Sequence, residues 1–139
     1  MESKFKREFC RYLDEKDVKY SELGENIFQV TFSDLKNMSR ISVQFNFDND
    51  GEGKVNVRTY DLGSFKSDDA FATGLLICNK MNTEYRWVRF YLDSDRDVVV
   101  DADAILSVGT VGEECAELML RLIDIADKAY PEFMKALWH

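Results

Sequence analysis

An α+β fold, in which helices pack on an antiparallel sheet, is predicted by three features of the sequence. Apolar residues recur at every second position in several segments between residues 27 and 102, which is typical of half-buried strands. Apolar residues at helical spacing occur near both ends and in the middle of the chain. The predicted strands are separated by short links, so we expect antiparallel neighbours. The predicted order is α-β-β-β-α-β-β-α, in two layers.

The N-terminal half is predicted to form one helix and three strands. Phe5, Phe9 and Leu13 fall at helical spacing, which predicts an amphipathic helix over about residues 2–17, and Gly24 interrupts the chain afterwards. Apolar residues alternate with polar ones in the segments IFQVTF (27–32), RISVQFNFD (40–48) and KVNVRTY (54–60). The link DNDGEG has the composition of a turn and predicts a hairpin between the last two of these strands.

The C-terminal half is predicted to form two helices around a second hairpin. Ser67 is a suitable N-cap for a helix over 67–82 that is apolar nearly all round, so we expect this helix to contact the sheet and a further surface. The strands YRWVRFYL (85–92) and DVVVDA (97–102) are joined through SDR. Thr110 and Glu113 predict a capping box for a long final helix, which Pro131 should kink or divide.

Composition limits the function classes. The 139 residues suffice for one domain over 1–139, and 45% apolar with 32% charged residues is typical of a chain that folds alone. A formal net charge of −8 disfavours binding to nucleic acid and to anionic membranes. The sequence shows neither a signal-peptide pattern nor a membrane-spanning apolar run, so we expect a cytoplasmic protein.

The cysteines and the single histidine do not suggest a catalytic site. Cys10, Cys78 and Cys115 are far apart in apolar helical patterns and are expected to be free thiols in the interior. His139 is the last residue, where it makes a poor general base. Histidine-dependent triads and zinc motifs are therefore excluded.

Three alternating aspartates, Asp93, Asp95 and Asp97, are the candidate metal ligands. A calcium loop starting at Asp93 would need Gly at position 6 and Glu at position 12, which the sequence lacks, and a loop starting at Asp48 fails at position 12. The DxD phosphatase motif would require a parallel βαβ context that is missing here. We therefore interpret the aspartates as turn residues of a hairpin, and keep a metal or ligand site there as the alternative.

Asp101 and Asp103 continue the acidic run. They are weighed as a paired-carboxylate site of the glycosidase type, but they are expected near a strand end where solvation is easy.

The strand 85–92 carries the preferred candidate for binding. Alternation places Val88, Phe90 and Leu92 toward the helices and Trp87, Arg89 and Tyr91 on the opposite face of the sheet. Exposed Trp, Tyr and Arg side chains are typical of protein interfaces, although loops or the chain's own terminus could cover them. We therefore assign Trp87, Arg89 and Tyr91 as a candidate protein interface.

The segment YRWVRFYLDSDRDVVVDAD, followed by TVGEECAELMLRLIDIADKAYPEFMKALW, resembles the C-terminal half of the YbjN-like family of bacterial sensory transduction regulators. The predicted element order is similar to the type III secretion chaperone-like fold of that family. The resemblance implies a small, acidic, cytoplasmic, often dimeric domain with no known reaction.

The sequence therefore predicts a non-enzymatic regulatory or chaperone-like protein without a cofactor, which binds a protein partner of unknown identity and forms a homodimer. Two alternatives stay open. One is a small metal-dependent or ligand-binding protein that uses Asp93, Asp95 and Asp97, and the other is a true type III secretion chaperone for an effector.

Overall fold

The structure is a computed structural model that describes residues 1–138, so His139 lies outside the described residues. Within them the chain forms three helices and six strands. In chain order these are α1 (Lys4–Glu15), β1 (Ser21–Gly24), β2 (Ile27–Ser33), β3 (Arg40–Phe47), β4 (Lys54–Thr59), α2 (Asp68–Glu84), β5 (Arg89–Leu92), β6 (Val98–Ile105) and α3 (Val111–Leu137). The predicted α+β class and order are confirmed, with one additional strand, β1.

All six strands join one antiparallel sheet in the order β1-β2-β3-β4-β6-β5. The predicted hairpins β3–β4 and β5–β6 are present, and β6 inserts between β4 and β5. The unpredicted strand β1 pairs with β2 at the sheet edge, and all four of its residues are exposed. Its sequence SELG therefore lacks the alternation of apolar residues that reveals the other strands.

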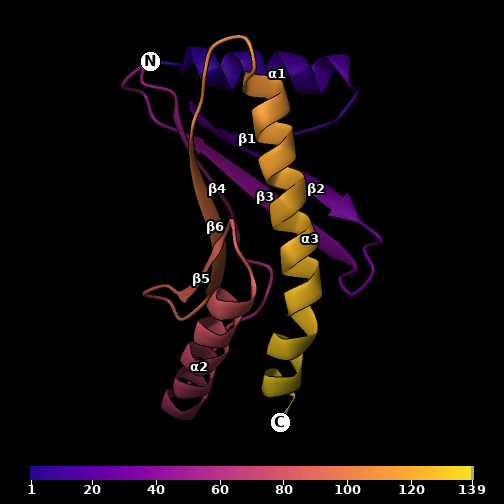
Figure 1. The fold of residues 1–139 in the computed structure, drawn as a ribbon, viewed down its shortest axis with the longest axis vertical. Helices are drawn as coiled ribbons and strands as arrows, with labels where there is room; N and C mark the ends of the chain where they lie inside the picture. Colours follow the sequence, from indigo (N-terminus) through magenta and orange to yellow (C-terminus); the bar gives the residue numbers. More distant parts are fainter. Residues whose placement is uncertain (139) are drawn as a thin grey trace.

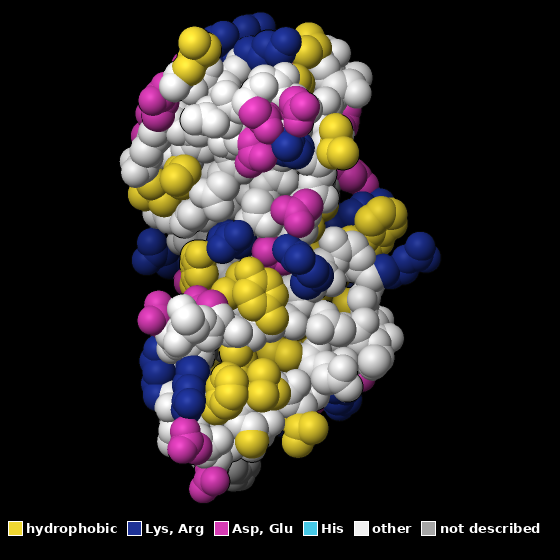
Figure 2. All heavy atoms as spheres, turned by 90° about the vertical axis from the view of Figure 1, so that its left-hand side faces the viewer, with side chains coloured by type: hydrophobic (Ala, Val, Ile, Leu, Met, Phe, Trp, Pro, Cys, Tyr) yellow, Lys and Arg dark blue, Asp and Glu magenta, His cyan; other side chains and the backbone are white. Residues whose placement is uncertain are grey.

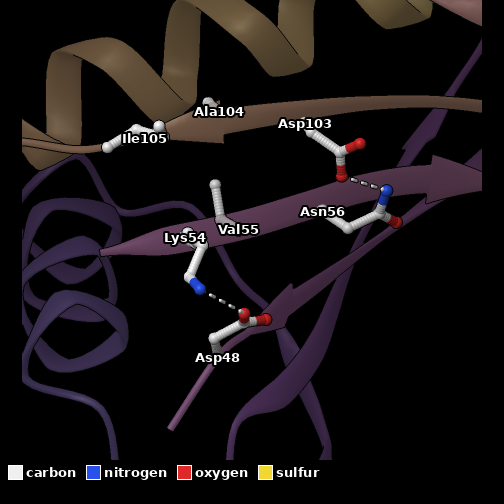
Figure 3. Close-up of a pocket in the computed structure, with 7 residues that line it drawn as sticks. All are labelled: Asp48, Lys54, Val55, Asn56, Asp103, Ala104 and Ile105. Carbon is white, nitrogen blue, oxygen red and sulfur yellow. Dashed lines mark hydrogen bonds and ion pairs between the residues drawn. The ribbon is translucent and has the colours of Figure 1, made fainter. Parts of the chain in front are cut away.

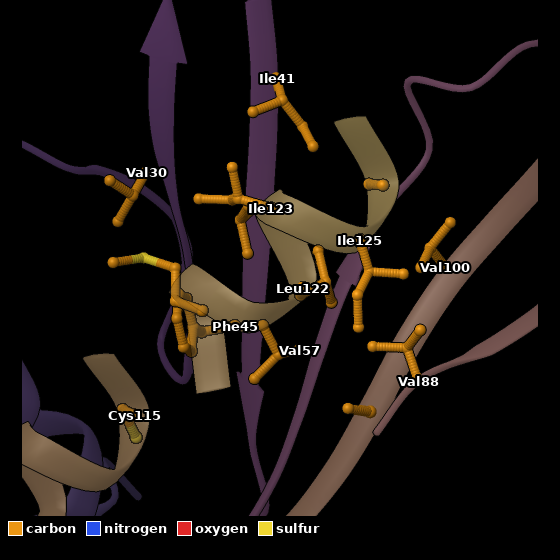
Figure 4. Packing of buried hydrophobic residues seen from close by; sticks show 14 of the residues in the cluster. Val30, Ile41, Phe45, Val57, Val88, Val100, Cys115, Leu122, Ile123 and Ile125 are labelled. Atoms are coloured by element: carbon orange, nitrogen blue, oxygen red, sulfur yellow. The ribbon is translucent and has the colours of Figure 1, made fainter. Parts of the chain in front are cut away.

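The three helices cover one face and one edge of this sheet (Figure 1). Phe9 of α1 packs against Phe28 and Phe45, with ring centroids 5.8 Å and 4.9 Å away. α3 crosses β3, β4 and β6, and its Leu122, Ile123 and Ile125 are buried in the same cluster (Figure 4). The face toward the helices is thus an apolar core, and the opposite face carries no helix.

α2 lies against the edge strand β5. A side chain at Gly74 would collide with Phe65 and Leu92, because an added Cβ would lie 2.8 Å and 2.9 Å from their nearest atoms. The Asn82 side chain donates to the Phe90 carbonyl (2.9 Å) and accepts from the Phe90 N–H (2.8 Å). It thereby satisfies outward-facing backbone groups that would otherwise be open to another strand.

α3 continues through Pro131 as one helix, so the expected division of the helix does not occur. A proline at this position leaves the carbonyl of Asp127, one turn earlier, without its helical donor. The Asn37 side-chain amide donates to that carbonyl at 3.0 Å, and the Asp127 carboxylate accepts from the N–H groups of Asn37 (3.0 Å) and Met38 (2.8 Å). The β2–β3 loop therefore replaces the bond that proline removes.

The predicted capping box of α3 is wrong. Thr110 makes no side-chain cap, and its hydroxyl bonds to Glu114 instead. The Glu8 carboxylate of α1 accepts from the N–H groups of Gly109 and Val111, each at 3.2 Å. A carboxylate at this end also complements the helix dipole. The cap is therefore a tertiary contact that ties α1 to α3.

The expected cysteine states are largely confirmed. All three thiols are free; Cys78 and Cys115 are buried, whereas Cys10 is half-buried. Burial raises the pKa of Cys78 to about 11, so this thiol stays protonated at neutral pH. Within residues 1–138, no helix has the length and apolarity needed to cross a membrane.

Candidate functional site

The three predicted interface residues do not share one face. β5 begins only at Arg89, and Trp87 precedes it with a φ of 82°. This positive φ ends the alternation before the strand starts, so the expected extended run over 85–92 is wrong in its first half. The Trp87 indole instead lies near α3, with the Arg121 guanidinium 5.1 Å from its centroid. Trp87 is therefore separate from Arg89 and Tyr91.

Arg89 and Tyr91 do lie on the open sheet face, and both contact Asp101 of β6. Arg89 donates through Nε and Nη2 to the two carboxylate oxygens of Asp101, at 2.9 Å each. The Tyr91 hydroxyl donates to the same carboxylate at 3.2 Å. The cross-strand pairing of Arg89 with Asp101 sets up this two-pronged contact.

Asp101 is the organising residue of the site. It is 0% exposed, although no helix covers this face, because its neighbours' side chains enclose it. Asn56 donates to it at 3.1 Å, and the Arg58 guanidinium lies 3.9 Å away. The expectation that it sits at a solvated strand end is therefore wrong. An aspartate placed directly after the apolar residues VVV (98–100) and before Ala102 was the sequence signal for a buried, paired carboxylate.

Two further residues extend the site, Arg58 on β4 and Tyr60 directly after that strand. Arg58 donates to the Tyr60 hydroxyl at 3.1 Å, and its guanidinium lies 6.0 Å from that ring. Arg89 makes a similar contact with Tyr91, at 5.9 Å. We call the four side chains Arg58, Tyr60, Arg89 and Tyr91, together with Asp101, the Arg–Tyr cluster.

The electrostatics fix the protonation states of Arg89 and Tyr91. Its hydrogen bond to Asp101 raises the pKa of Arg89, which therefore stays a cation. Burial, aided by the Asp101 charge, raises the pKa of Tyr91, so its hydroxyl stays a neutral donor. Arg89 is thus a fixed cation and Tyr91 a neutral phenol, and the residues of the cluster lack the arrangement of a nucleophile beside a general base.

The open face changes character along its length. Figure 2 views the molecule from the side of α2 and β5 and shows acidic side chains gathered around a basic one in the upper half, with basic side chains across the middle. Figure 3 shows the groove at one end of the face, where Lys54, Asn56, Asp103 and Ile105 lie on the adjacent strands β4 and β6.

The outer surface of α2 exposes two leucines. Leu75 is 45% exposed and Leu76 73% exposed, while Gly74, Cys78 and Met81 on the inner side are buried. Figure 2 shows apolar side chains gathered in its lower half, where α2 lies. The sequence feature noted for this helix, apolar residues nearly all round, therefore corresponds to one covered and one uncovered side.

The candidate metal ligands lie in the β5–β6 turn. Asp93, Asp95 and Asp97 each have a carboxylate oxygen within 4.8 Å of the others. The Asp93 carboxylate accepts from the N–H groups of Asp95 (2.9 Å) and Asp97 (3.0 Å), which is the turn chemistry expected. Asp97 also bonds to Ser64 and Lys66, and these contacts lower its pKa. Cation binding at this turn stays an untested alternative.

Solved structures with the same fold include a regulator of the YbjN type and two complexes from type III secretion systems. YbjN from E. coli, described as "a putative transcription regulator", has a TM-score of 0.65 at 11% identity over 91% of this chain and 88% of that one. The Yersinia pestis type III secretion chaperone SycH, in complex with a fragment of YscM2, has a TM-score of 0.53 at 13% identity over 90% and 96%. The ExoU–SpcU complex of the Pseudomonas aeruginosa type III secretion system gives 0.54 at 15% identity over 91% and 94%.

These identities establish a shared fold and no shared activity. No curated protein sequence matches the chain significantly. The family model for YbjN, "Putative bacterial sensory transduction regulator", matches residues 8–135, which include all six strands, the whole of α2 and most of α1 and α3. The chain therefore belongs to the YbjN family, with a fold shared by type III secretion chaperones.

Proposed function

We propose that this chain is a non-enzymatic regulatory or chaperone-like protein of the cytoplasm, which acts as one domain by binding another protein across its open sheet face. The observation that carries the proposal is the Arg–Tyr cluster, held in place by the buried Asp101 carboxylate. Three structures of the same fold are described as protein complexes, namely ExsC–ExsE, SycH with a fragment of YscM2, and ExoU–SpcU, which supports a binding role.

The Arg–Tyr cluster has the properties of a binding hot spot. Arginine and tyrosine are enriched where interfaces gain most of their energy. The Arg89 side chain is 62% exposed although its Nε and Nη2 donate to carboxylate oxygens of Asp101 and Asp103. A side chain that is ordered before binding loses little rotamer freedom on binding. The cluster is therefore both accessible and preorganised.

The binding claim is tested by quantitative capture from native lysate. We expect Arg89→Ala combined with Tyr91→Ala to lose the specific partner, whereas the exposed Arg40→Ala, on the same sheet, retains it. Trp87→Ala, on the α3 side, shows whether Trp87 contributes to partner binding separately from Arg89 and Tyr91. Equal capture by all variants with unchanged folding would contradict the proposal.

A homodimer is proposed through the outer surface of α2. Exposed Leu75 and Leu76 on one helix can pack against the same residues of a second copy about a two-fold axis. Size-exclusion chromatography with light scattering should give twice the chain mass for the wild type and one chain mass for Leu75→Ser with Leu76→Ser. A wild-type monomer at tens of micromolar would exclude this dimer.

A secretion chaperone proper is the second candidate, and the similarity to SycH favours it. The partner captured in the same experiment discriminates the two. A secreted effector supports the chaperone function, whereas a cytoplasmic regulatory protein supports the family description.

A further inference from the structure

A groove of about 610 Å³ lies at the end of the open sheet face where β4 begins and β6 ends. Lys54 pairs with Ile105 across the strands, and Asn56 pairs with Asp103. The Asn56 amide donates to Asp103 at 2.8 Å and closes the side nearest the Arg–Tyr cluster (Figure 3). Arg58 lies four residues beyond Lys54 on β4, a distance of about 13 Å at strand spacing.

The groove exposes an aliphatic side chain on a mostly polar face. Ile105 is 79% exposed, whereas the alternate β6 residues Asp101 and Val99 on the same face are fully buried. An isoleucine at this position gains little for folding, because burial in the core is what makes apolar side chains stabilising. Burial of the Ile105 side chain under a partner would instead stabilise the complex.

The rim of the groove is acidic. The Lys54 ammonium lies 3.8 Å from Asp48, 2.8 Å from Asp50 and 3.0 Å from Glu52. Three carboxylates therefore share one ammonium, while Asp103 on the opposite side of the groove pairs with Arg89. The surplus negative charge agrees with the net charge of −8 for the whole chain and favours a cationic partner.

We propose that this groove binds a segment of a partner protein in which an aliphatic side chain is flanked by lysine or arginine. The aliphatic side chain covers Ile105, and the flanking cations meet the carboxylates of Asp48, Asp50 and Glu52. The inference rests on the proposed function, because it requires that the open face binds a protein. It adds the orientation in which the partner segment lies on that face. The segment's basic part lies at the groove and its acidic or polar part lies at Arg58 and Arg89.

The test uses three synthetic peptides of equal length and the intact chain. One peptide alternates Lys with Leu, one alternates Lys with Ser, and one alternates Glu with Leu. In amide NMR spectra at moderate salt, we expect the Lys–Leu peptide to shift the signals of residues 54–56 and 103–105, and the other two to shift them far less. Equal shifts from the Lys–Ser peptide would indicate charge attraction alone and overturn the inference, as would shifts confined to other residues.

Two variants and one control locate the contacts. Ile105→Ser and Glu52→Lys should each weaken Lys–Leu binding about tenfold. Leu23→Ser removes another exposed aliphatic residue, from the edge strand β1 away from the groove, and should leave binding unchanged. Wild-type affinity in both groove variants would overturn the inference, and thermal unfolding verifies that each variant is folded.

Two further outcomes separate this inference from others. If the same amide signals shift with protein concentration in the absence of peptide, the groove is occupied by a second copy and the inference is wrong. If the peptides fail while partner capture still depends on Arg89 and Tyr91, the groove assignment fails and the proposed function stands.

Discussion

The two faces of the one sheet use the same strands for different purposes. On β3, Phe45 is buried among aromatic rings beneath the helices, while the next residue on the other side, Gln44, is only half-buried and bonds to Asn46 at 3.0 Å. On β6, Val100 faces the core, whereas Asp101 faces the open side and belongs to the Arg–Tyr cluster. One set of alternate positions thus stabilises the fold, and the other carries the features that suggest binding.

The largest expected difference between the faces is in core packing. Phe45→Ala removes a ring that lies 4.9 Å from Phe9 and 5.2 Å from Phe28, and should lower the free energy of unfolding by about 3–5 kcal/mol. Gln44→Ala, on the open face, should change it by less than about 0.5 kcal/mol. Denaturant unfolding of both variants measures the contrast, and similar losses would mean that the open face contributes to the core.

Asp101 is the one residue of the open face whose substitution we expect to reduce stability strongly. Asp101→Ala leaves the Arg89 guanidinium, the Tyr91 hydroxyl and the Asn56 amide without their common acceptor, and should lower the free energy of unfolding by about 2 kcal/mol. The matched variant is Asp103→Ala, whose side chain is 65% exposed, and its cost should stay below about 1 kcal/mol. Equal costs in urea unfolding would show that the cluster is held by surface charge alone.

The sequence predicts one face of the sheet far better than the other. Val43, Phe45 and Phe47 alternate with polar residues and lie in the core as expected, because burying apolar surface dominates folding and leaves a periodic record. β1 leaves no such record, since its residues are all exposed. The strand order was also out of reach, because the position of β6 between β4 and β5 depends on pairing across α2 and not on any local pattern.

The candidate site was predicted in part for a related reason. Alternation places Arg89 and Tyr91 together, and the structure brings them to one carboxylate. Trp87 departs from them because a positive φ, which residue patterns rarely reveal outside glycine, ends the alternation. Arg58 comes from β4, with Tyr60 directly after that strand, and only the sheet order brings Arg58 beside Asp101.

The smallest expected effect concerns the helix-covered side, at the bond that replaces the one removed by Pro131. Asn37→Ala deletes the amide that donates to the Asp127 carbonyl, and should lower the free energy of unfolding by about 1 kcal/mol. In a Pro131→Ala background the new backbone N–H can bond to that carbonyl, so the same substitution should cost about 0.5 kcal/mol less. Denaturant unfolding of the wild type, both single variants and the double variant measures this coupling.

The exposed neighbour Lys36→Ala serves as the control for this cycle, because it lies in the same loop and should cost the same in either background. Equal costs of Asn37→Ala in the two backgrounds would show that the loop amide and the proline are independent. A positive coupling would instead mean that a surface loop between β2 and β3 is what allows a proline inside the long helix. The covered face would then depend on a polar contact at its margin, as the open face depends on Asp101.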